Sequence, residues 1–135
     1  MNKKLNLTIL ILAITVSIGY SQTKTNTVVQ ATAPVKNNDA VFQLFQTQNM
    51  WTFIKLNTRT GQMWQVQYNT EDDKRFETNL NSISLVPKEK EQNGRFNLYA
   101  TQNIYSFILL DQIDGKTWQV QWSSKPENRL VLPIE

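Results

Sequence analysis

The chain contains an internal duplication, which restricts the fold more than any other feature of the sequence. At a constant separation of 54 positions, residues 42–69 align with residues 96–123 without a gap, and 13 of the 28 pairs are identical. Unrelated sequences would share only about two positions over this length. The motif Trp-Gln-Val-Gln at 64–67 recurs in full at 118–121. The chain is therefore predicted to build one structural unit twice.

The ends of the two units match at a different separation. Leu-Val-Pro at 85–87 resembles Val-Leu-Pro at 131–133, which are 46 positions apart. This shift predicts eight extra residues in the first copy, within the charged stretch around 71–77. On this basis the first repeat covers about 41–88 and the second about 95–135.

Each unit is predicted to form four short strands, because aromatic and β-branched residues occur in short runs bounded by turn residues. No segment has a helical period, so the protein is predicted to be all-β. The expected strands, with equivalents paired, are 41–46 and 95–100, 50–56 and 104–110, 62–68 and 116–122, and 83–86 and 130–132.

The third strand of each unit alternates strictly between apolar residues and glutamine. A period of two is typical of a half-buried antiparallel strand. We therefore expect one face of this strand to be buried in both copies: Trp64, Val66, Tyr68, Trp118, Val120 and Trp122. The opposite face is expected to meet water: Gln65, Gln67, Gln119 and Gln121.

Turn chemistry supports the strand boundaries. The segments 57–61 and 111–115 begin with Asn or Asp and end with Gly61 or Gly115, a pattern that closes short hairpins. Asn93-Gly94 introduces the second unit in the same way, and Pro87 and Pro133 are predicted to end the fourth strands.

Two architectures satisfy this pattern. The first is two tandem four-stranded antiparallel repeats that form a barrel or sandwich with a pseudo-two-fold axis. The second is a pair of propeller-like blades that completes a ring by oligomerising. The first is preferred, because the 114 residues left after removal of a leader can bury a core unaided.

The N-terminus reads as a signal peptide covering residues 1–21. Lys3 and Lys4 precede a short apolar run, and small residues before Gln22 mark a cleavage site. The run is shorter than the roughly 20 residues that a membrane-spanning helix needs, so no stable insertion is expected after cleavage. Residues 22–40 read as a flexible linker, with a strand around 28–29 as the alternative. Export to the periplasm or the extracellular space is therefore predicted.

Composition narrows the chemistry that the protein can perform. Without the leader the chain has 12 basic and 11 acidic side chains, and this near-neutral balance argues against nucleic acid as a partner. The sequence contains no His and no Cys, which removes imidazole bases, thiol nucleophiles and the usual zinc sites. We predict no cofactor and no disulfide, so the core or self-association must hold the fold together.

Carboxylate chemistry remains to be considered, because a glycan hydrolase needs two facing acids. The acids of the first copy's charged stretch and of the second copy's turn are interpreted as solvated loop residues, without raised pKa values. The turn also lacks the 12-residue pattern of an EF-hand calcium loop, so neither a catalytic nor a metal site is predicted. The acids concerned are Glu71, Asp72, Asp73, Glu77, Asp111 and Asp114.

A ligand surface is the remaining candidate site. Aromatic rings beside amides suit carbohydrate, since a sugar ring stacks on the aromatic ring while amides bind its hydroxyls. The alternative is that the tryptophans are core and the glutamines only a solvated sheet face. The candidate ligand surface comprises Trp51, Tyr105, Gln65, Gln67, Gln119 and Gln121.

The pattern N-x-W/Y-x-F-I-x-L-N/D followed by G-x-x-W-Q-V-Q, in tracts 42–68 and 96–122, resembles repeats of small uncharacterised exported bacterial proteins. The closing segment 127–134 is typical of them too, and the resemblance covers most of residues 41–135. It implies no activity. We predict a non-enzymatic exported module that binds a protein or glycan partner; the alternatives are a lectin-like domain, a carboxylate-dependent glycan hydrolase, and a structural module stabilised by self-association.

Overall fold

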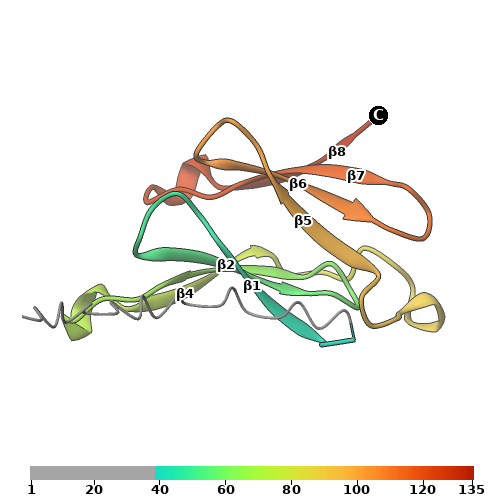
Figure 1. Ribbon diagram of the computed structural model, residues 1–135, viewed down its shortest axis with the longest axis horizontal. Helices are drawn as coiled ribbons and strands as arrows, with labels where there is room; N and C mark the ends of the chain where they lie inside the picture. Colours follow the sequence, from blue (N-terminus) through green and yellow to red (C-terminus); the bar gives the residue numbers. More distant parts are fainter. Residues whose placement is uncertain (1–38) are drawn as a thin grey trace, which may run out of the picture. The chain divides into compact units, whose positions relative to one another are not determined.

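The computed structural model describes residues 39–135, and these form two four-stranded antiparallel sheets. The predicted signal peptide and the predicted linker up to residue 38 lie outside the described residues. Figure 1 shows the sheets as two layers, which are stacked as a sandwich and not closed into a barrel. The predicted all-β fold with two tandem four-stranded repeats is therefore confirmed.

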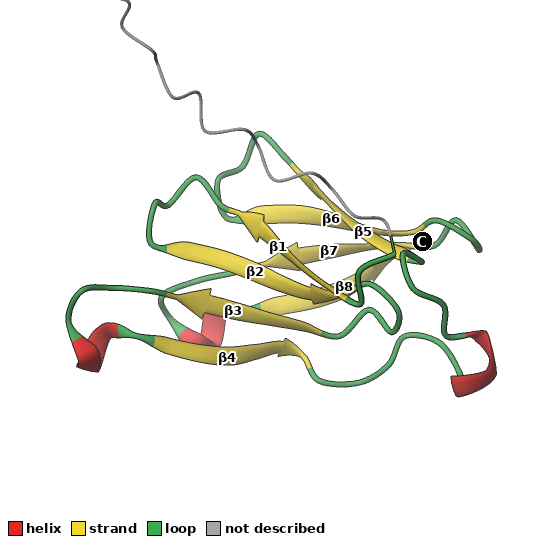
Figure 2. Ribbon diagram, turned by 60° about the horizontal axis from the view of Figure 1, so that its bottom comes forward, coloured by secondary structure: helices red, strands yellow, loops and turns green. Residues whose placement is uncertain are grey.

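Each sheet is a meander in which consecutive strands are neighbours (Figure 2). Sheet A contains β1 (Phe42–Gln46), β2 (Thr52–Asn57), β3 (Met63–Gln67) and β4 (Phe76–Asn81). Sheet B contains β5 (Phe96–Ala100), β6 (Ser106–Asp111), β7 (Thr117–Gln121) and β8 (Leu130–Ile134). Three single-turn 3-10 helices lie in the connections between strands: η1 (Asp72–Lys74) between β3 and β4, η2 (Lys88–Lys90) between β4 and β5, and η3 (Pro126–Asn128) between β7 and β8.

The fourth strand of the first repeat lies earlier in the chain than predicted. Gln67 pairs with Phe76, and Gln121 pairs with Leu130 at the same relative position, so β4 and β8 keep the separation of 54. The prediction of a strand at 83–86, and of eight extra residues around 71–77, is wrong. Segment 82–95 instead connects the sheets. Leu85 and Val86 of this segment pack against the core, which accounts for the apolar run that predicted a strand here.

The two predicted hairpin turns are confirmed. Gly61 and Gly115 have φ angles of 79° and 72°, a region that favours glycine. In the first turn the Asn57 carboxamide oxygen accepts a hydrogen bond from the Arg59 main-chain N–H at 3.0 Å. Asp111 accepts the equivalent bond from Ile113 at 3.0 Å. The same local chemistry therefore closes the same turn in both sheets.

The two sheets bury opposite faces. In sheet B the aromatic face of β7 is buried as predicted, and Trp118, Val120 and Trp122 belong to the core. In sheet A the buried side of β3 carries Met63 and Gln65, which are fully buried. The prediction that Trp64, Val66 and Tyr68 point inward, and Gln65 outward, is therefore wrong for the first repeat.

These faces recur throughout the structure, so we name them by their residues. The aromatic face of the first repeat contains Phe42, Leu44, Phe53, Lys55, Trp64, Val66 and Tyr68, and that of the second contains Phe96, Leu98, Phe107, Leu109, Trp118, Val120 and Trp122. The aliphatic face of the first repeat contains Phe45, Ile54, Leu56, Met63 and Gln65, and that of the second contains Tyr99, Ile108, Leu110, Thr117 and Gln119.

The core forms where the aliphatic face of sheet A packs on the aromatic face of sheet B. Two hydrogen bonds cross between the sheets: Phe96 N–H donates to the Thr58 main-chain oxygen at 2.7 Å, and Ser123 N–H donates to the Gln65 side-chain oxygen at 3.3 Å. A two-fold axis would bring equivalent faces together. Because unlike faces are stacked, the predicted pseudo-two-fold axis does not relate the two repeats, although the predicted sandwich is confirmed.

The equivalent tryptophans provide a direct test of this arrangement. Trp118→Ala is expected to lower the free energy of unfolding by about 3–5 kcal/mol, because it removes a buried ring from the core. Trp64→Ala is expected to cost about 1 kcal/mol, because the ring lies half-buried on the outer face. Urea denaturation of both variants measures the difference, and equal losses would contradict the assignment of buried faces.

Candidate functional site: the outer aromatic face of sheet A

The outer surface of sheet A consists of the aromatic face of the first repeat. Phe42 and Leu44 are 54% and 62% exposed, whereas their equivalents Phe96 and Leu98 are 1% and 5% exposed. The rest of the face includes half-buried Phe53 and Trp64 and exposed Tyr68. Contiguous apolar surface of this kind marks interaction sites on soluble proteins. This outer aromatic face is the candidate functional site.

Packing between the side chains organises the face. The ring centroids of Phe42 and Trp64 lie 6.2 Å apart, and those of Phe53 and Tyr68 lie 6.0 Å apart. Trp51, from the β1–β2 hairpin, extends the face by packing on Tyr68 at 5.3 Å. These separations lie in the range that aromatic pairs prefer. The rings therefore hold one another in place, and no other part of residues 39–135 forms a layer over them.

An ion pair lies within the apolar surface of this face. The Lys55 ammonium contacts the Glu77 carboxylate at 2.5 Å and lies 4.7 Å from the centre of the Trp64 ring. The equivalent positions in the second repeat are Leu109 and Val131, which pack in the core. A charge pair in place of two aliphatic residues is suited to a surface that is accessible to water, because water can solvate both charges.

The opposite outer surface of the protein is the aliphatic face of sheet B, bordered by β8. Tyr99 is 46% exposed, and Ile108 and Leu110 beside it are half-buried. Leu132 and Ile134 pair with Gln119 and Thr117 and leave about half of their surface in solvent. This outer aliphatic face is thus the uncovered equivalent of the face that sheet A buries.

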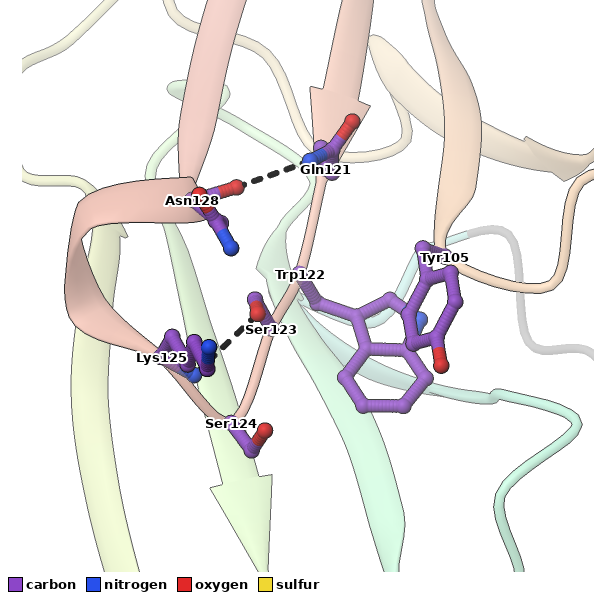
Figure 3. Close-up of a pocket in the computed structure, with 7 residues that line it drawn as sticks. All are labelled: Tyr105, Gln121, Trp122, Ser123, Ser124, Lys125 and Asn128. Atoms are coloured by element: carbon purple, nitrogen blue, oxygen red, sulfur yellow. Dashed lines mark hydrogen bonds between the residues drawn. The ribbon is translucent and has the colours of Figure 1, made fainter.

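A small hollow lies where β7 meets η3 (Figure 3). It measures about 260 Å³, and the Tyr105 ring stands beside Trp122 at its edge. The Gln121 carboxamide donates to the Asn128 main-chain oxygen at 2.9 Å. None of the described residues that line the hollow is acidic. The hollow therefore offers one exposed ring with amide and hydroxyl groups nearby.

The predicted ligand surface is not assembled as one site. Trp51 lies beside the outer aromatic face, whereas Tyr105 and Gln121 line the hollow. Gln119 is exposed on the outer aliphatic face, and Gln67 is half-buried. Gln65 is fully buried between the sheets, and its side-chain nitrogen has no hydrogen-bond partner. Its interpretation as an outward binding residue is wrong, because sheet A turns this side of β3 inward.

A buried ion pair joins the beginning of β5 to the end of β6. The Arg95 guanidinium donates to Asp111 at 2.7 Å and to Asp114 at 2.6 Å. Burial alone would raise the pKa of Asp111, but hydrogen bonds from Arg95 and from the Asp114 and Ile113 N–H groups lower it below its usual value. The interpretation of Asp111 as a solvated loop acid is therefore wrong. Its position after an apolar strand was the available signal.

The acids of the predicted charged stretch are exposed, with Glu71, Asp72 and Asp73 in the connection between β3 and β4 and Glu77 on β4. Glu71 pairs with Lys74, and Asp72 pairs with Arg75, all at exposed positions. Within residues 39–135, no group of three His, Cys, Asp or Glu side chains is placed to hold a metal ion together. None of the helices in that range is long and apolar enough to cross a membrane.

Sequence reasoning missed the outer aromatic face, because the two copies look alike where their environments differ. The signal was present in the few positions at which the copies differ in polarity. Lys55 replaces Leu109 and Glu77 replaces Val131, and both changes lie on one face of sheet A. Two charges at positions that are core in the other repeat indicate that this face is not interior.

Comparison of the chain with protein-family models, with curated proteins and with solved structures finds no match.

The buried ion pair predicts how stability depends on pH. The unfolded Asp111 pKa is about 3.9 and the folded value is lower, so the stabilisation is complete above about pH 4 and is lost as pH falls through the folded pKa. Asp111→Asn should lower the free energy of unfolding by roughly 3 kcal/mol at neutral pH, because it leaves Arg95 buried beside a neutral partner. It should also reduce the loss of stability between about pH 4 and pH 2, which is the acid limb of the pH profile.

Glu77→Gln is the matched control, since it removes a surface ion pair and should cost at most about 1 kcal/mol. Urea denaturation between pH 2 and 7 measures both variants. An unchanged acid limb in Asp111→Asn would show that this pair is not responsible.

Proposed function

We propose that this protein is an exported, non-enzymatic interaction module, and that it binds the apolar surface of another protein chain through the outer aromatic face of sheet A. One observation carries the proposal. The residues of this face are equivalent to those that form the core in sheet B, yet Phe42 and Leu44 are more than half exposed. Burying such surface is the main driving force of protein association.

The chemistry of the face favours a protein over a small molecule. The rings pack on one another across one side of the sheet, around the Lys55–Glu77 pair. Aromatic residues are enriched at the centres of protein interfaces, where a large rigid ring loses little conformational entropy. Lys55 and Glu77 supply one charge of each sign, which can fix the register of a partner.

Export and the lack of catalysis are supported by the sequence. The leader-like pattern of residues 1–21 supports secretion to the periplasm or beyond. A chain without His or Cys has few general bases and nucleophiles. The buried carboxylate of Asp111 is hydrogen-bonded to Arg95, and this pairing suits a structural role.

Photocrosslinking in the producing cells tests the proposed function. A benzoylphenylalanine at Leu44 should give a discrete adduct of higher mass, because a bound protein would lie within reach of this exposed position. The same probe at exposed Glu89, on η2 and away from the face, is the control and should give none. Equal labelling from both positions, or no adduct from Leu44, would contradict the proposal.

Carbohydrate binding at the hollow is a second candidate function. Tyr105 is 47% exposed there and stands beside the Trp122 ring, while Gln121 and Asn128 line the same hollow (Figure 3). An exposed ring beside polar groups can stack on a sugar and hydrogen-bond its hydroxyls. The hollow is smaller than most ligand pockets, so it suits a single terminal sugar residue.

A glycan array with the full chain tests this second function. Tyr105→Ala should abolish any glycan signal, because the stacking ring is lost. Trp51→Ala, the equivalent change in the first repeat, should leave the signal intact, since Trp51 does not line the hollow. If the wild-type chain binds no glycan on the array, or if both variants lose binding equally, the hollow is not a sugar site.

A further inference from the structure

We infer that the partner of the outer aromatic face is the outer aliphatic face of a second copy of this chain, so that copies assemble head to tail. The inference rests on the proposed function and names its partner. It follows from the packing inside one molecule, where the aliphatic face of sheet A already covers the aromatic face of sheet B. The duplication leaves the two complementary faces uncovered at opposite sides of the sandwich.

The uncovered faces match the buried ones residue by residue. Phe42, Leu44 and Trp64 correspond to Phe96, Leu98 and Trp118, which the first repeat covers. On the other side, Ile108 and Leu110 correspond to Ile54 and Leu56, which provide the cover. A contact between the outer faces would therefore continue the interface that already exists between the sheets.

The polar contacts of the internal interface also have counterparts. Thr58 O accepts from Phe96 N–H inside the molecule, and the equivalent pair between copies is Gln112 O with Phe42 N–H. The two hairpins share their local hydrogen bonding, since Thr58 N–H donates to Val41 O as Gln112 N–H does to Arg95 O, each at 2.8 Å. The intermolecular bond would therefore use the same local geometry.

Gln119 provides a second counterpart. Its equivalent Gln65 is buried between the sheets and accepts from Ser123 N–H at 3.3 Å. Between copies, the same contact would join the Gln119 carboxamide to the main chain at Asn69 of the neighbouring molecule. Because both repeats carry glutamine at this position, the same polar contact can form inside one molecule and between two.

The differences between the two interfaces indicate a reversible assembly. Lys55 and Glu77 occupy the positions of Leu109 and Val131, so association between copies must cover an ion pair that the internal interface lacks. Covering a charge pair is less favourable than covering two aliphatic residues. The contact between molecules is therefore weaker than the contact within one.

Symmetry follows from the use of unlike faces. Each copy presents one aromatic and one aliphatic surface, so the contact is heterologous and every added copy exposes the same two surfaces again. Such a contact closes into a ring if the rotation between copies permits it and otherwise extends as a filament. Successive four-stranded sheets packed in this way would give a propeller-like or solenoid-like stack.

Complementation between two interface variants tests the inference on the full chain. Leu44→Asp places a charge on the outer aromatic face, and Leu132→Asp does so on the outer aliphatic face; both side chains are more than half exposed, so folding should be preserved. By size exclusion with light scattering, the wild type should exceed the monomer mass and each variant should be monomeric. An equimolar mixture should recover a dimer with twice the monomer mass, because one intact pair of faces remains.

Other results would overturn the inference. A monomeric wild type, a mixture that stays monomeric, or one variant that assembles by itself would each exclude contact between unlike faces. If a variant loses its cooperative thermal transition, Phe42→Ser or Ile134→Asp replaces it on the same face. A Leu44 adduct with a different protein, found with a monomeric wild type, would leave the proposed function intact and remove only self-assembly.

A designed gain of assembly is the matched experiment. Lys55→Leu combined with Glu77→Val gives the outer aromatic face the residues of its buried equivalent. The concentration at which half of the chains are assembled should fall about tenfold or more, because the ion pair no longer needs to be desolvated. Adding Leu132→Asp should abolish this gain. A gain that persists with Leu132→Asp would indicate contact between like faces and overturn the inference.

Discussion

The contact between the aliphatic face of sheet A and the aromatic face of sheet B holds this fold together. Neither four-stranded sheet has another layer among the described residues, and the sequence offers no disulfide that could replace a core. The fully buried side chains of Ile54, Leu56 and Met63 therefore pack on a surface that contains Trp118 and Val120. Burial of this apolar surface is the main free-energy source that can offset the ordering of the chain.

Polar groups define how the two faces meet. Thr58 is a junction, since its carbonyl accepts from Phe96 while its hydroxyl donates to Ala40 and accepts from Gly94 N–H. The Arg95–Asp111 pair fixes the beginning of sheet B beside this junction. Apolar packing alone tolerates small shifts, whereas buried hydrogen bonds of fixed geometry do not. Together with the hydrogen bond from Ser123 N–H to Gln65, these polar contacts help to fix how the unlike faces stack.

A stack of unlike faces always leaves one face of each kind uncovered. Here the uncovered surfaces are the outer aromatic face around Trp64 and the outer aliphatic face around Leu132. The Lys55–Glu77 pair makes the first of them compatible with water while keeping its rings exposed. Function as an interaction module and assembly from identical copies both follow from this geometry, and neither requires chemistry that the chain lacks.

The sequence by itself determined the duplication, the all-β class, seven of the eight strands and the glycine turns at Gly61 and Gly115, because these depend on local periodicity and backbone conformation. Only the tertiary structure decided which side of each sheet is interior. The alternation of Trp64 with Gln65 is the same in both copies, and a sheet with apolar residues on both sides can bury either one. The choice arises mainly from the partner sheet, and within the sequence only the charges at Lys55 and Glu77 indicate that this side of sheet A is not interior.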